Sequence, residues 1–195
     1  PAGTWLPGGA SNTGGEALAR WGQGRLAELD RAADARGPST IISWPLRRAG
    51  ERFPIVQPAA AGFTEGSAVD EADAYRADLE GVAYLERLAY ERLSELGARR
   101  TGLVITVGGG ARSLAWSKIR ATVLGGGVAL AAHASTSLGA CLLAAAGTIH
   151  PDLTTAGQAM LRPARIIEPE NAAYEAMEDS YARWIQALRR RGWLA

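Results

Sequence analysis

Three consecutive glycines between a strand and a helix are the residues with the clearest chemical potential. An almost continuous apolar run over residues 102–107 leads into Gly108, Gly109 and Gly110, and Ser113 stands where a helix should begin. Glycines let backbone N–H groups approach a ligand closely, and a helix N-terminus favours anionic or polar groups. Glycine turns of this kind are also common in α/β proteins, so the local pattern leaves nucleotide binding and simple turn chemistry open.

Two well-known nucleotide motifs do not fit this turn. A dinucleotide-binding Rossmann site needs an acidic residue at the end of the next strand, and residues 128–137 contain no Asp or Glu. A phosphate-binding P-loop needs Gly-Lys-Ser/Thr directly after the glycines, whereas Lys118 lies a turn into the following helix. Both motifs are therefore disfavoured.

Other reactive side chains are few. His133 and His150 are the only histidines and lie far apart in the sequence, so we predict neither a metal site nor a catalytic histidine. Cys141, the single cysteine, lies on an Ala-rich helical segment and is expected to be a buried, inert thiol. Because one cysteine cannot form an internal disulfide, a reducing cytoplasm fits best. Arg112 is expected to be exposed.

Two groups of charged residues are expected to stabilise the fold and not to take part in catalysis. Asp70, Glu71 and Asp73 stand where a helix should start, and they would complement its dipole. Glu51 and Arg52 are predicted to form an ion pair within a Pro-rich loop.

An α/β arrangement must position the glycine turn. Apolar residues three and four apart predict helices, β-branched and apolar runs predict strands, and Gly or Pro residues end both. Helices are expected over residues 15–36, 71–96, 113–124, 135–146 and 170–191, and a turn with a helix over 151–162. Strands are expected over 40–44, over 102–107, buried on both faces, and over 128–132, with a brief extended piece at 166–167. Residues 45–69 are expected to form a long loop.

Composition excludes several classes of protein. With 195 residues, 47% of them hydrophobic and 21% charged, the chain can bury a single core, which argues against disorder. Its net charge of +1 argues against a nucleic-acid-binding arm or a polybasic membrane segment. Glycines, His133 and a Ser/Thr cluster interrupt the most apolar stretch, residues 123–147, so no transmembrane helix is expected. The start at Pro1, without Met or a signal peptide, suggests a fragment or processed product.

Several segments, in order along the chain, resemble the C-terminal lobe of the FGGY carbohydrate kinases. The first is Gly108-Gly109-Gly110-Ala111-Arg112-Ser113, followed by Trp116, Ile119 and Val123 and then by Ser135, Gly139 and Ala140. Residues 9–15 resemble the segment that opens the first long helix of that lobe, and residues 50–54 resemble the Gly-Glu-Arg-x-Pro loop. Residues 79–84 resemble its central helix, although Asp78 stands where a small or apolar residue is usual.

The resemblance implies an α/β, ribonuclease-H-like domain of the actin-like ATPase architecture, the C-terminal lobe of a two-domain sugar kinase. Residues 1–195 would form one nucleotide-binding domain, with the N-terminal sugar-binding domain, the catalytic carboxylate and the opening phosphate hairpin upstream of Pro1. No catalytic or metal-ligating residue is therefore expected in this chain. The family implies ATP and Mg²⁺ as cofactors, a pentulose such as xylulose or ribulose as substrate, a homodimer, and a bacterial, cytoplasmic enzyme.

Site residues follow from the same resemblance. Gly109, Gly110 and Ala111 would line the adenosine and α-phosphate side of an ATP site, with Ser113 near the adenine. Gly14 and Gly15 would form the facing wall. A non-catalytic α/β oligomerisation or interaction module is the alternative, and ATP binding would distinguish the two. A nicotinamide-dependent dehydrogenase is a third class, which would bind NAD instead.

Overall fold

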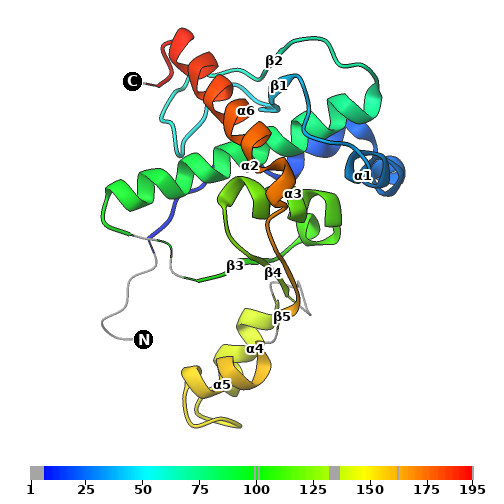
Figure 1. The fold of residues 1–195 in the computed structure, drawn as a ribbon. Helices are drawn as coiled ribbons and strands as arrows, with labels where there is room; N and C mark the ends of the chain where they lie inside the picture. The colour runs from blue at the N-terminus through cyan, green and yellow to red at the C-terminus, as the bar shows by residue number, and fades with distance from the viewer. Residues whose placement is uncertain (1–6, 99, 101, 132–136, 162, 195) are drawn as a thin grey trace.

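The computed structural model describes residues 7–98, 100, 102–131, 137–161 and 163–194 of the chain. Its centre is one long helix, α2 (Glu71–Glu95), which other helices and a short β-hairpin surround, and a small three-stranded sheet lies to one side (Figure 1). None of the described helices combines the length and the apolar character that a bilayer crossing requires.

The expected helix over residues 15–36 is broken into three pieces. Two 3₁₀ helices, η1 (Gly15–Trp21) and η2 (Gln23–Arg25), precede α1 (Leu26–Asp34). Gly22 separates the first two with φ +75° and ψ 128°, a conformation that ends a helix and that glycine adopts without strain. The prediction of one continuous helix is therefore wrong, although the segment is helical on both sides of the break.

Two short strands form an antiparallel hairpin beside α2. β1 (Ile42–Trp44) lies within the expected strand, but its partner β2 (Phe63–Glu65) falls in the segment expected to be loop. β2 has only three residues, which is too few to show an alternating pattern. Gly81 of α2 allows β1 to approach, because a Cβ at this position would lie 2.0 Å from the Ser43 carbonyl oxygen.

Helix α2 confirms the expected central helix. Asp70 caps its N-terminus, where the carboxylate accepts a hydrogen bond from the Asp73 N–H at 2.9 Å. Gly97 follows its C-terminus with φ +89°, as a glycine stop does. The helix packs against α1, β1 and two later helices, so most of its length is buried.

The hydrogen bonds of Asp78 explain why a carboxylate can stand where the family usually has a small or apolar residue. Its buried carboxylate accepts hydrogen bonds from Arg20 Nε at 2.8 Å, Trp21 Nε1 at 2.9 Å and Ser43 Oγ at 2.8 Å. Burial raises the pKa of Asp78, and these partners offset the effect. The carboxylate thus ties η1 and β1 to the central helix.

The three-stranded sheet contains the predicted parallel unit. β3 (Val104–Thr106) pairs in parallel with β4 (Val128–Ala131), and β4 pairs antiparallel with β5 (Pro163–Ile167). Helix α3 (Leu114–Leu124) connects β3 to β4 and covers one face, where Val104 is buried. The opposite face is open, since Ile105 is 65% exposed, so the prediction that this strand is buried on both faces is wrong.

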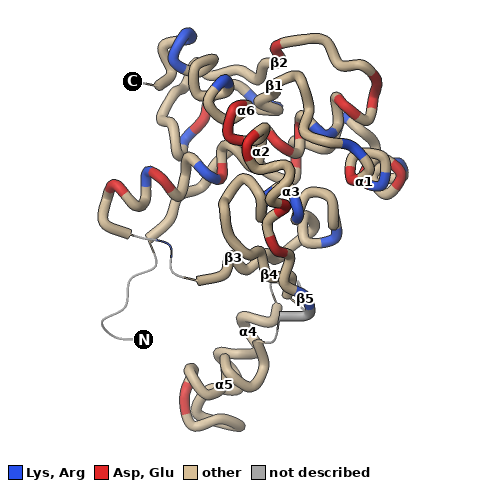
Figure 2. Tube along the Cα trace, in the orientation of Figure 1, with Lys and Arg blue, Asp and Glu red and all other residues tan. Residues whose placement is uncertain are grey.

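Helices α4 (Ser137–Ala145) and α5 (Leu153–Met160) pack on each other and project away from the central helix (Figure 1). Their part of the chain and the sheet carry few charged residues, whereas the helices around α2 carry many (Figure 2). Cys141 is exposed on α4, so the expected buried thiol is wrong. The helix has few neighbours that could cover it.

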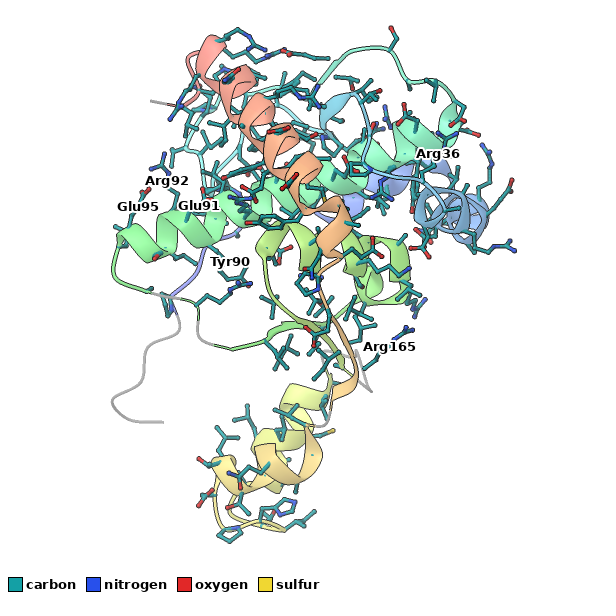
Figure 3. All side chains as sticks on the ribbon, in the orientation of Figure 1. Arg36, Tyr90, Glu91, Arg92, Glu95 and Arg165 are labelled. Carbon is teal, nitrogen blue, oxygen red and sulfur yellow. The ribbon has the colours of Figure 1, made fainter. Side chains whose placement is uncertain are left out.

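The last helix, α6 (Asn171–Arg190), confirms the amphipathic pattern expected near the C-terminus. Met177, Tyr181, Trp184 and Leu188 face the core, and Trp184 Nε1 donates to the Ser43 carbonyl oxygen at 3.1 Å. Glu91, Arg92 and Glu95 lie toward the C-terminal end of α2 (Figure 3), where Glu91 accepts a hydrogen bond from Tyr181 Oη of α6 at 2.5 Å and Arg92 pairs with Glu95.

Candidate functional site

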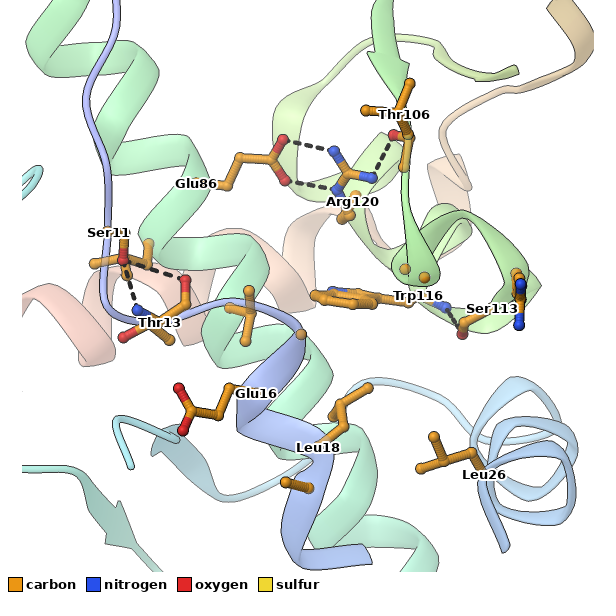
Figure 4. Close-up of a pocket in the computed structure, with 18 of the residues that line it drawn as sticks. Ser11, Thr13, Glu16, Leu18, Leu26, Glu86, Thr106, Ser113, Trp116 and Arg120 are labelled. Atoms are coloured by element: carbon orange, nitrogen blue, oxygen red, sulfur yellow. Dashed lines mark hydrogen bonds and ion pairs between the residues drawn. The ribbon is translucent and has the colours of Figure 1, made fainter. Parts of the chain in front are cut away.

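A cavity of about 990 Å³ opens between η1, α1, α2 and the turn that follows β3 (Figure 4). Apolar side chains such as Leu18, Leu26 and Leu85 line one part of it, and polar side chains such as Thr106 and Arg120 line another. Its volume lies at the upper end of the range usual for small-molecule sites, about 300–1,000 Å³. The cavity is therefore the candidate site.

Both glycine segments singled out from the sequence meet at this cavity. Gly15 lines it from the start of η1, and Gly109, Gly110 and Ser113 line it from the turn after β3. Gly14 and Ala111 are next to lining residues and are not themselves among them. Residues about a hundred positions apart in the sequence thus face one space.

The three glycines of the turn differ in the structural reason for having no side chain. Gly108 has φ +84°, which favours glycine. A Cβ on Gly110 would lie 2.9 Å from Cζ3 of Trp116, so this glycine lets the indole ring pack against the turn. A Cβ on Gly109 or Gly15 would have no heavy atom within 4 Å, so packing does not explain glycine there.

Ser113 has a structural partner on each side. Its Oγ accepts a hydrogen bond from the Trp116 N–H at 3.0 Å, which caps α3, and donates to Asp30 Oδ1 at 2.8 Å. Tyr75 Oη donates to the same Asp30 oxygen at 2.7 Å, and burial together with this contact raises the pKa of Tyr75. Ser113 therefore joins α3 to Asp30 of α1, and Asp30 joins both to α2 at the cavity.

An ion pair that the sequence analysis missed forms the polar part of the wall. Arg120 donates from Nε and Nη2 to the two carboxylate oxygens of Glu86, at 2.6 and 2.7 Å, and from Nη1 to Thr106 Oγ1 at 2.5 Å (Figure 4). Burial opposes the charged form of Arg120, but the Glu86 carboxylate outweighs it and raises the pKa. No local sequence motif predicts this ion pair, because its two residues lie 34 positions apart on two helices.

Trp116 contributes an unsatisfied donor at the same place. Its side chain lines the cavity, the residue is 6% exposed, and its Nε1 is the one buried side-chain polar atom without a hydrogen-bond partner among the described residues. A buried N–H without an acceptor costs about 1–3 kcal/mol. Arg112, by contrast, is exposed at the rim, as expected.

The expected ion pair between Glu51 and Arg52 is absent from the ion pairs of the described residues. Glu51 is buried and accepts the Arg52 backbone N–H at 2.9 Å, together with donors from residues 11–13. The Pro-rich loop is therefore attached to the segment before η1, and paired backbone hydrogen bonds between Glu51 and Gln57 also close it on itself.

Possible metal ligands do not come together in the part of the chain that the structure describes. Among residues 7–98, 100, 102–131, 137–161 and 163–194, no group of three His, Cys, Asp or Glu side chains is arranged to hold a metal ion. His150 is among these residues, while His133 lies outside the part of the chain that the structure describes.

Comparison with known proteins gives the family context of this cavity. Residues 5–148 match the sequence model of the FGGY family of carbohydrate kinases, C-terminal domain. This match covers both glycine segments and all of α2 and α3.

Solved structures of sugar kinases superpose on most of the chain. A xyloylose kinase from Brucella ovis is 29% identical in sequence and superposes with a TM-score of 0.78. The alignment covers 91% of this chain and 38% of the Brucella chain. A xylulose kinase from Rhodospirillum rubrum is 27% identical, with 90% and 36% covered and a TM-score of 0.69. The fold is shared by a Plasmodium falciparum glycerol kinase with ADP, which is 16% identical and superposes with a TM-score of 0.72. That alignment covers 90% of this chain and 35% of the glycerol kinase chain. The chain thus spans less than two fifths of the length of these proteins.

Proposed function

Since the chain belongs to the FGGY family of carbohydrate kinases, we propose that it supplies the ATP-binding part of a sugar kinase. Its mixed α/β structure matches the C-terminal domains of such kinases, which have the ribonuclease-H-like fold of actin-like ATPases. We take residues 1–195 as one such domain. The whole enzyme would transfer a phosphoryl group to a hydroxyl of a sugar or polyol, with a pentulose such as xylulose or ribulose favoured.

One observation carries this proposal: both glycine segments line one cavity. Gly15 and Gly109 have open space where a side chain would begin, so their backbone is accessible to a ligand. The apolar wall near Leu18 and Leu26 suits an aromatic base, and the start of α3 suits a phosphate group. Gly14, Ala111 and Ser113 would complete the site.

The chemistry assigned to this chain is binding and orientation. ATP supplies the transferred phosphoryl group when bound, and its positioning accounts for much of the catalysis of phosphoryl transfer. The described part of the chain has no cluster of carboxylates for a metal ion, so Mg²⁺ would be held chiefly by the phosphates and by water. We assign no catalytic residue to this chain. A cytoplasmic, bacterial homodimer remains part of the proposal.

A second candidate function rests on the open face of the sheet. Ile105 in β3 exposes its apolar side chain, and so do Leu103 and Val107, which directly precede and follow this strand. Exposed apolar patches often mark interaction sites. A non-catalytic interaction or oligomerisation module would use this face and leave the cavity unused.

Thermal unfolding with and without nucleotide tests the proposal. At ligand concentrations about a hundred times Kd, binding stabilises a protein by about 2.7 kcal/mol, which corresponds to roughly 5–11 °C for a chain of this size. We expect ATP with Mg²⁺ to raise the melting temperature and NAD to leave it unchanged. A melting temperature that ATP does not change, combined with self-association in sedimentation experiments, would favour the interaction module.

A further inference from the structure

Glu51 holds the segment that leads into the cavity. Its Oε1 accepts the Asn12 N–H at 2.6 Å, and its Oε2 accepts Ser11 Oγ at 2.8 Å and Thr13 Oγ1 at 3.0 Å. The residue is 2% exposed, so water reaches little of this network. One carboxylate therefore fixes three consecutive residues that lie about forty positions earlier in the chain.

Within the described part of the chain, no cationic side chain forms an ion pair with this buried carboxylate. None of the ion pairs among the described residues includes Glu51, and only backbone and hydroxyl donors stabilise its carboxylate. A buried carboxylate without a cation is costly, and charge-assisted hydrogen bonds must offset that cost. Packing alone does not explain this desolvation cost, because an apolar residue in the same space would avoid it.

The segment that Glu51 holds is part of the cavity wall. Ser11 and Thr13 line the cavity, and so does Gly15, two residues after Thr13. Thr13 Oγ1 also accepts Trp44 Nε1 at 3.0 Å, which anchors the segment to the core. Phe53, from the same loop as Glu51, also lines the cavity and packs against Gly9, where a Cβ would lie 2.3 Å from the ring.

We propose that Glu51 is a positioning residue for nucleotide binding: it holds residues 11–15 in the shape that the ligand requires, without touching the ligand. This inference rests on the proposed function, since it takes ATP as the ligand. Preorganised walls increase affinity because less ordering is required upon binding.

Glu80 provides a matched control for a merely structural role. It is also a buried glutamate, 1% exposed, and it contacts Arg76 Nε at 2.8 Å and the Ser39 N–H at 3.1 Å. It is not among the residues that line the cavity. Glu80→Gln therefore perturbs a buried carboxylate network that does not line the cavity, although this network includes the cation Arg76.

The test compares Glu51→Ala, Glu51→Gln and Glu80→Gln with the unsubstituted chain. Affinity is measured with a fluorescent N-methylanthraniloyl derivative of ATP in Mg²⁺, at a temperature where thermal unfolding shows each protein folded. Hydrogen exchange of the peptides covering residues 9–15 and 71–95 is measured in parallel. Glu51→Gln retains the acceptor for the Asn12 N–H, so it carries the test if Glu51→Ala does not fold.

We expect Glu51→Ala to raise Kd about tenfold, Glu51→Gln to raise it less, and Glu80→Gln to leave it unchanged. Exchange should accelerate in residues 9–15 of Glu51→Ala but not in residues 71–95. The inference about Glu51 would be overturned by unchanged ATP affinity in both Glu51 variants, by an equal loss of affinity in Glu80→Gln, or by unaltered exchange of residues 9–15. None of these three results would overturn the proposed function. If the unsubstituted chain binds no ATP derivative, the proposed function itself fails.

Discussion

Neighbouring glycines of the turn after β3 should respond in opposite ways to the same substitution. In Gly110→Ala, the new Cβ would lie 2.9 Å from Cζ3 and 3.3 Å from Cε3 of Trp116. Ordinary carbon contacts are about 3.5–4.0 Å, so the ring must move by at least about 0.6 Å. Trp116 belongs to the main core, and overpacking of this kind costs about 1–3 kcal/mol of unfolding free energy.

Gly109→Ala meets no such obstacle. No heavy atom lies within 4 Å of the position of its Cβ, and its φ is outside the left-handed region that favours glycine. Replacing glycine by alanine at a compatible position stabilises a protein by about 0.4–1 kcal/mol, because the unfolded chain loses freedom. Its unfolding free energy should therefore be unchanged or higher.

Urea unfolding followed by tryptophan fluorescence measures both changes, and titration with Mg-ATP adds the functional comparison. Gly109→Ala should bind the nucleotide about tenfold more weakly if the ligand approaches this backbone. Gly139→Ala is the control, because Gly139 is an exposed helical glycine of α4 with open space around it. Equal destabilisation by Gly109→Ala and Gly110→Ala would refute the geometric reasoning, and undiminished nucleotide affinity in Gly109→Ala would refute its functional extension.

Two further substitutions test the contacts around the cavity and the central helix. Ser113→Ala removes both the cap of α3 and the hydrogen bond to Asp30. Calorimetry should therefore show a loss of about 1–2 kcal/mol of unfolding free energy, or a melting temperature lower by roughly 2–8 °C. A melting temperature equal to that of the exposed control Ser67→Ala would contradict this expectation. Burial raises the pKa of Glu80 from 4.5 to about 7, with Arg76 opposing. A carboxyl whose pKa is raised by folding contributes stability that is present at low pH and lost as the pH rises from about 4.5 to 7, here about 3 kcal/mol. Urea unfolding at pH 5 and 7.5 should show this loss in the unsubstituted chain and less of it in Glu80→Gln, whereas parallel pH profiles would exclude it.

Local patterns were sufficient where neighbours in sequence determine the structure. Apolar residues three and four apart, an acidic start and Gly97 predicted α2 almost to the residue. The glycine turn and Ser113 predicted the start of α3, and the family resemblance, which the family match confirms, predicted that distant glycine segments belong together.

Long-range contacts explain what the sequence could not reveal. The exposure of Ile105 depends on whether an element covers the second face of the sheet, which an apolar run cannot show. The same holds for Cys141 on the projecting helix α4. The pairing of Glu86 with Arg120, and of Glu51 with residues 11–13, arises only when separate segments meet. The break at Gly22 was missed because apolar spacing continues on both sides of it.

If both glycine segments face one nucleotide site, amide NMR spectra recorded during a titration with Mg-ATP should respond in both segments at once. We expect the amide signals of Gly15, Gly109 and Gly110 to shift together with one dissociation constant. The amide signals of Gly139 and Gly192, which do not line the cavity, should stay unchanged. Shifts confined to one glycine segment, or no shifts at saturating nucleotide, would show that the two segments do not form one nucleotide site.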